Sequence, residues 1–149
     1  MVTTAQIDLV QSSFRQVLPI ADTVGELLYG RIFVLAPESR VLFDDDIGPQ
    51  AKRLMAAVKV AVDGLARLDE VAPFLVKLGA RHVRYGVGPE HFAVGAEALM
   101  WTLEQGLGEA FSADVRDAWL AAWNVIADAM LTGMRQAERD GAGTPVLSG

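Results

Sequence analysis

The two histidines of the chain both lie in one stretch, residues 73 to 92, which reads PFLVKLGARHVRYGVGPEHF. On a helix, Leu75, Leu78 and His82 share one face, so His82 continues an otherwise apolar row. A buried imidazole needs a hydrogen-bond partner or a metal ion, because leaving its nitrogens unsatisfied costs free energy. His82 is therefore either a core histidine bonded to a carbonyl oxygen or a metal ligand.

A metal site made of side chains alone is not indicated near His82. The chain has no cysteine, and His91 lies beyond two glycines and a proline, at the start of the next expected helix. A single imidazole suffices, however, when a macrocycle supplies the other ligands, as in haem. Such a proximal histidine lies in an apolar slot with its second ring nitrogen held by an acceptor such as a carbonyl. His82 meets this requirement, whereas His91 is more simply a polar residue at a helix start or haem edge.

Helical periodicity extends over the whole chain of 149 residues, so we expect a single all-α domain. Prolines and polar caps divide this pattern into segments. The first expected helix begins at the Thr3–Gln6 capping box and ends at Pro19. The second spans about 22–35 and is followed by a short helical turn from Pro37 to Phe43. Four more helices are expected: Pro49 to Leu65, Pro73 to Tyr85, Pro89 to Gly106 and Ser112 to Arg139.

Composition excludes several classes of protein. The formal net charge of -6 argues against nonspecific nucleic-acid binding, and Lys52, Arg53 and Lys59 are expected to form a solvated helix face. The sequence contains no uninterrupted run of about 18 apolar residues, so it predicts no transmembrane helix. The N-terminal residues do not resemble a secretion signal, and the lack of cysteine precludes disulfides, so we expect a reducing cytoplasm.

Two segments carry a family resemblance. Residues 78–95, LGARHVRYGVGPEHFAVG, resemble the proximal helix, the corner after it and the next helix of the globin family. Residues 27–43, LLYGRIFVLAPESRVLF, resemble its second and third helices, including the proline and phenylalanine at Pro37 and Phe43. The chain is especially similar to bacterial single-domain globins, flavohaemoglobin haem domains and neuroglobin-like chains. The resemblance implies an all-α, three-on-three globin fold over residues 1–140, with a short CD region and no D helix. The composition of residues 141–149 is typical of a flexible tail.

The resemblance also implies the cofactor haem b, with His82 as the metal ligand. Tyr29 and Gln50 take the catalytic positions on the distal side, and Gly25 and Ala51 are small residues where two helices cross. The implied haem contacts are Phe43, Gln50, Leu54, Leu78, His82, Val87 and Phe92.

Both distal residues also have simpler interpretations. Tyr29 could cover core with its hydroxyl bonded locally, and Gln50 could face solvent in a first helical turn. As distal residues, each would donate a charge-assisted hydrogen bond to a gas ligand, worth about 1.5–3 kcal/mol, and so slow oxygen release.

Other residues leave alternatives open. The glutamate that supports the proximal histidine in flavohaemoglobins has no counterpart in MLTGMRQ (130–136), so strong electron donation to the iron is not expected. Arg53 and Arg84 could pair with haem propionates or be surface charges. The tryptophans Trp101, Trp119 and Trp123 indicate core or a dimer surface.

The function implied is reversible binding of oxygen, nitric oxide or carbon monoxide at a pentacoordinate haem iron. It would support nitric oxide dioxygenation with an external reductase, because the flavin and nicotinamide domains of flavohaemoglobins do not follow in this sequence. The alternative is non-catalytic oxygen storage, scavenging or delivery, and a sensor ranks last. Whether the protein is an enzyme, and whether it is a monomer or homodimer, stays open.

Overall fold

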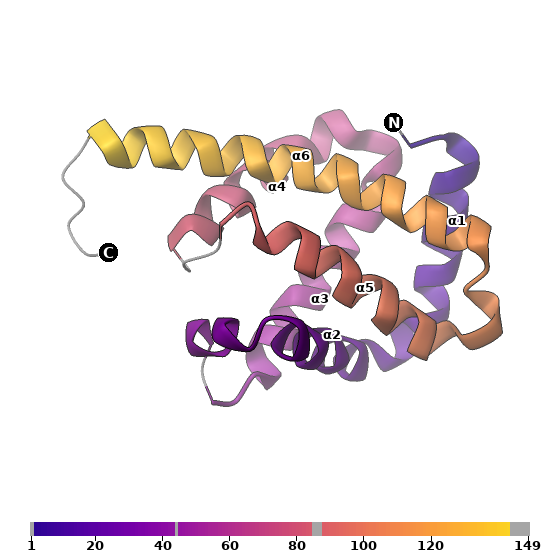
Figure 1. The fold of residues 1–149 in the computed structure, drawn as a ribbon. Coiled ribbons are helices and arrows are strands. Elements are labelled where there is room, and N and C mark those ends of the chain that lie inside the picture. The colour runs from indigo at the N-terminus through magenta and orange to yellow at the C-terminus, as the bar shows by residue number, and fades with distance from the viewer. Residues whose placement is uncertain (1, 44, 85–87, 144–149) are drawn as a thin grey trace.

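The computed structural model describes residues 2–43, 45–84 and 88–143, and six α-helices account for most of them (Figure 1). No strand occurs in these ranges. The helices are α1 (Thr4–Val17), α2 (Ala21–Leu35), α3 (Gly48–Asp63), α4 (Leu68–Arg84), α5 (His91–Leu107) and α6 (Ala113–Gly143). Short 3-10 segments follow four of them: η1 (Leu18–Ile20), η2 (Pro37–Leu42), η3 (Leu65–Arg67) and η4 (Gly108–Ala110).

The first and last helices begin at the predicted capping residues. Thr3 Oγ1 accepts from the backbone N–H of Gln6 at 3.1 Å, and Gln6 Oε1 accepts from the Thr3 N–H at 3.0 Å. Ser112 Oγ accepts from the N–H of Val115 at 3.3 Å. These side chains satisfy backbone donors that the first turn of a helix leaves without partners.

Several predicted boundaries were wrong by a few residues. α3 ends at Asp63 instead of Leu65, and α4 begins at Leu68, so that Pro73 lies inside it. Pro73 is exposed and stands in the second turn, where a proline forfeits one backbone hydrogen bond. α5 begins at His91, two residues after Pro89. α6 continues to Gly143, beyond the predicted end at Arg139.

The helices pack as the predicted three-on-three arrangement. In Figure 1, α5 and α6 run side by side while α1 crosses one end of them. α6 packs against α1 and α4, and α2 packs against α3 and α5. No helix in the described part of the chain is both long and apolar enough to cross a bilayer.

Small residues permit two close helix crossings. A Cβ added at Gly25 of α2 would lie 2.9 Å from the carbonyl oxygen of Ala51 on α3, which confirms the predicted crossing. The second crossing was not predicted: a Cβ at Gly79 of α4 would overlap the backbone of Met130, and one at Gly133 of α6 would overlap the backbone of Val76. α4 and α6 are therefore in backbone contact just before His82.

The first and last helices are also joined in the core. Trp119 is 3% exposed, and its Nε1–H donates to Ser13 Oγ at 2.9 Å. Ser13 is itself buried on α1. This bond gives the indole donor a partner inside the apolar core, as a buried tryptophan requires.

Candidate functional site

His82 projects from the last turns of α4. Its Nδ1 lies 2.7 Å from the carbonyl oxygen of Leu78, one turn earlier. A carbonyl oxygen only accepts hydrogen bonds, so Nδ1 carries the proton and donates. In this tautomer Nε2 holds the lone pair, which is the arrangement of a metal-binding histidine oriented by a backbone acceptor.

The surroundings of His82 keep its imidazole neutral. Burial lowers the pKa of His82, the Leu78 hydrogen bond opposes this shift, and the positive charge of Arg81 lowers the pKa further. The net pKa lies below the ordinary value, so the ring is uncharged at neutral pH. Only the neutral ring offers a nitrogen lone pair to a metal.

Apolar residues of α4 and α5 share a small core cluster, and two of them precede His82 on its own row of α4. Leu75 is 1% exposed, and Leu78 and Phe92 border the same small core cluster. The ring of Phe92 contacts Trp123 at 6.3 Å between centroids. Val87 lies outside the described residues, as does the side chain of Arg84.

The candidate residues expected on the distal side form a second group, separate from that of His82, which contains three aromatic rings. Tyr29 on α2 meets Phe43 edge to face, with centroids 4.9 Å apart. Phe33, one turn after Tyr29, lies nearly parallel to it at 6.3 Å and meets Phe43 at 5.2 Å. The structure thus brings Tyr29 and Phe43 together, and it adds Phe33, which was not among the predicted site residues. Spacing could have suggested it, since Phe33 lies four residues after Tyr29.

Gln50 lies in the first turn of α3, next to the Gly25–Ala51 crossing. Its Oε1 is buried and has no hydrogen-bond partner among the described residues. A solvent-facing amide would have water as a partner, so this position does not fit the simpler interpretation. Leu54, one turn later, is half-buried against the main core.

The two groups lie at the same end of the molecule. In Figure 1, the end of α4 and the start of α5 are on the same side as the end of α2 and η2. An oriented neutral imidazole with apolar neighbours fits a haem iron. The buried Oε1 of Gln50, which accepts no hydrogen bond from the described residues, leaves room for a hydrogen-bond donor beside it.

His91 has a structural role, as its simpler interpretation predicted. It is the first residue of α5, and its Nδ1 accepts from the backbone N–H of Gly88 at 2.8 Å. The Glu90 carboxylate lies 3.8 Å from the same atom. On the surface, Lys52, Arg53 and Lys59 are exposed as predicted.

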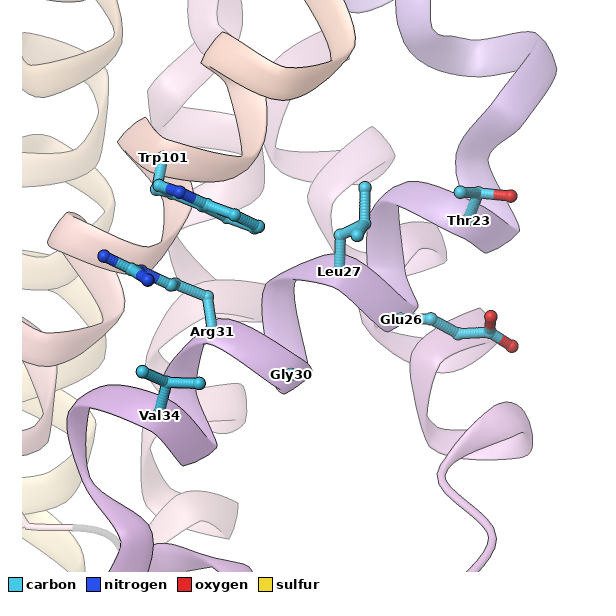
Figure 2. A pocket seen from close by; sticks show the side chains of 7 residues that line it. All are labelled: Thr23, Glu26, Leu27, Gly30, Arg31, Val34 and Trp101. Atoms are coloured by element: carbon cyan, nitrogen blue, oxygen red, sulfur yellow. The ribbon is translucent and has the colours of Figure 1, made fainter.

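A separate groove of about 280 Å³ lies between α2 and α5 (Figure 2). The guanidinium of Arg31 stacks there over the ring of Trp101 at 4.9 Å. The other lining residues are Thr23, Glu26, Leu27, Gly30 and Val34. None of the predicted site residues lines this groove, so we do not assign the site to it.

Comparison with known proteins identifies the family. A sequence profile described as Globin matches residues 26–130, the range that contains Tyr29, Gln50 and His82. The chain belongs to the globin family. Family membership implies that this globin binds haem and small gas ligands.

Individual relatives agree with this assignment. A neuroglobin of Tetraodon nigroviridis is 30% identical over 132 residues, which cover 79% of this chain and 83% of the neuroglobin. A flavohemoprotein of Bordetella parapertussis is 30% identical over 147 residues, covering 91% of this globin but 37% of the flavohemoprotein. A solved carbene transferase, engineered from a candidate nitric oxide dioxygenase of Rhodothermus marinus, shares the fold with a TM-score of 0.86 at 20% identity. That match covers 95% of this chain and 99% of the solved one.

Proposed function

We propose that this globin holds haem b through Nε2 of His82 and uses it to bind oxygen, nitric oxide and carbon monoxide. The observation that carries the proposal is the bond from His82 Nδ1 to the Leu78 carbonyl, which orients a neutral imidazole as a metal ligand. The proposed contacts to the macrocycle are Phe43, Gln50, Leu54, Leu78, Val87 and Phe92.

Haem, when bound, would supply an iron centre that takes up diatomic gases and exchanges single electrons. The protein's contribution is to exclude water and to place hydrogen-bond donors. Phe43 and Leu54 provide apolar surface on the distal side, and the packed rings restrict Tyr29. The Tyr29 hydroxyl and the Gln50 amide would each donate to a gas ligand that carries partial negative charge, so oxygen would be retained.

The reaction we propose is nitric oxide dioxygenation, in which nitric oxide, oxygen and one electron yield nitrate. A separate cytoplasmic reductase would return the electron. The flavohemoprotein relatives and the solved Rhodothermus marinus relative support this class of reaction. Retention of oxygen by Tyr29 and Gln50 favours it too, because the second gas must arrive before the first has left.

The alternative is oxygen storage, scavenging or delivery without turnover. The neuroglobin match, which covers most of both chains, keeps this alternative open. The oxygen dissociation rate separates the two functions, since delivery requires release on the timescale of use, whereas dioxygenation tolerates very slow release.

Two measurements test the proposal. Absorption spectra of the purified protein, oxidised, reduced and under carbon monoxide, should show the Soret band of a haem with one protein ligand in the reduced state. Nitric oxide should then be converted to nitrate with many turnovers when oxygen, a reductase and its nicotinamide are present. Colourless protein after haem supplementation would refute haem binding. A single turnover at best, with reductase in excess, would refute dioxygenation and leave the storage alternative.

A further inference from the structure

We infer that Arg40 is a positioning residue for the distal pocket: it clamps the corner after Phe43 and thereby fixes the ring of Tyr29 and the start of α3. This inference rests on the proposed function, since it assigns Arg40 an effect on the gas ligand. Arg40 lies on the 3-10 segment η2 and was not singled out by the sequence.

The first contact is a bridge between two carbonyl groups. Arg40 Nη1 donates to the carbonyl oxygen of Phe43 at 3.3 Å, and Nη2 donates to the carbonyl oxygen of Asp45 at 2.9 Å. A guanidinium holds its donors in a rigid planar fork, so both acceptors are held at a fixed separation. Arg40 therefore holds the backbone at Phe43 and at Asp45, two positions near the start of the corner that leads to Gly48.

The second contact is with the aromatic cluster. Cζ of Arg40 lies 5.0 Å from the centroid of the Phe33 ring, in a cation–π arrangement. Phe33 in turn lies parallel to Tyr29, and Phe43 meets both rings edge to face. One side chain thus touches the ring that packs on Tyr29 and the backbone that carries Phe43.

These contacts converge on the two proposed donors. Tyr29 is restricted by Phe33 and Phe43, both of which Arg40 contacts. Gln50 lies two residues after the start of α3 at Gly48, where the clamped corner ends. A change at Arg40 should therefore alter hydrogen bonding to a gas ligand even though Arg40 is not proposed to touch that ligand.

The test compares variants in the reduced carbon monoxide complex, in which the C–O stretching frequency reports hydrogen bonding to the ligand. Arg40→Met keeps the apolar stem and removes the fork, and Arg40→Lys keeps the charge but cannot bridge both carbonyls in plane. Arg67→Met is the matched control, because Arg67 also lies on a 3-10 segment and pairs with Glu70 at 3.0 Å. Tyr29→Phe gives the C–O stretching frequency expected when the tyrosine hydroxyl donates no hydrogen bond to the ligand.

We expect the Arg40→Met band to move toward that of Tyr29→Phe, with oxygen dissociation about threefold to tenfold faster, as for weakening one hydrogen bond. Arg40→Lys should lie between wild type and Arg40→Met, and Arg67→Met should match wild type. When Arg40→Met is combined with Tyr29→Phe, the C–O stretching band should shift little beyond its position in Tyr29→Phe alone, because Arg40 is proposed to act through Tyr29. A purely stabilising role would lower the melting temperature and leave the band in place.

A band of Arg40→Met that coincides with wild type, while Tyr29→Phe shifts it, would overturn the inference. Failure of Arg40→Met to fold would leave Arg40→Lys to decide by the same criterion. Failure of the proposed function is distinguishable, because wild type itself would then lack a Soret band. In that case, proton NMR tests the positioning role through the contacts between the Tyr29 and Phe33 rings. If these contacts persist unchanged in Arg40→Met, the positioning role is refuted.

Discussion

His82 Nδ1 donates to the Leu78 carbonyl at 2.7 Å, so the orientation of the candidate iron ligand is set by the backbone of its own helix. No carboxylate is needed for this, and the acceptor is neutral. A neutral acceptor withdraws the Nδ1 proton less than a carboxylate would, which fits the sequence expectation of limited electron donation. Peroxidase activity should accordingly be weak.

Replacing the proposed iron ligand should abolish haem binding. His82→Ala is expected to lose the Soret band after haem supplementation, because no other imidazole is proposed for that position. Added imidazole should restore the band by occupying the space left behind. His91→Asn is the matched control and should keep the band, since His91 Nδ1 accepts from Gly88 at the start of α5. Wild-type haem affinity in His82→Ala would contradict the assignment.

The haem-free protein should lose stability on mild acidification through His82. Its folded-state pKa is lowered, chiefly by burial, from an ordinary value of 6.5. The unfolded chain therefore binds more protons between the two pKa values, so this contribution is complete above about pH 6.5 and declines as the pH falls toward the folded pKa. Urea unfolding at pH 7.5 and 5.5 measures the loss in the free energy of unfolding, and His82→Gln is the reference that lacks this titrating group. An equal loss in both proteins would exclude His82 as a source.

Removing either distal donor should speed oxygen release. Tyr29→Phe and Gln50→Leu each delete one proposed hydrogen bond, worth about 1.5–3 kcal/mol, so each should raise the dissociation rate by about tenfold or more. Stopped-flow displacement of oxygen by carbon monoxide measures the rate. Gln105→Leu, at an exposed glutamine of α5, controls for the loss of an amide and should change nothing. Unchanged release in Gln50→Leu would remove Gln50 from the distal site.

Two glycine substitutions should act in opposite directions. Gly79→Ala places a methyl group against the Met130 backbone and should lower the free energy of unfolding by about 2–3 kcal/mol. Gly30→Ala meets nothing within 4 Å on an exposed helix face. It should raise stability by about 0.5–1 kcal/mol, because alanine restricts the unfolded chain. Denaturant titration compares the pair, and a neutral Gly79→Ala would contradict the close crossing.

The parts of the fold that were predictable depend on local chemistry. The Thr3–Gln6 capping box and the Ser112 cap act on backbone groups within a few residues, so the sequence alone contains the interaction. Pro73 was misleading because it predicted the start of a helix, whereas it lies inside one. Proline is tolerated near the beginning of a helix, and the pattern did not show that α4 begins five residues earlier.

The candidate site was predictable to a smaller extent. Helical spacing drew attention to His82, but Tyr29 and Gln50 were identified only through the family resemblance. Phe33 was missed although its spacing from Tyr29 on α2 could have suggested it. Arg40 and the Gly79–Met130 contact were missed because each depends on which distant segments or corners meet in space. No periodicity within one helix contains that information.

The bond between Trp119 and Ser13 spans 106 positions of the chain, and α6 also supplies the backbone on which α4 packs. During synthesis, neither contact can form until the last helix has left the ribosome. Nascent chains that lack α6 should therefore expose the apolar faces of α1 and α4, and chaperone engagement should precede cofactor capture.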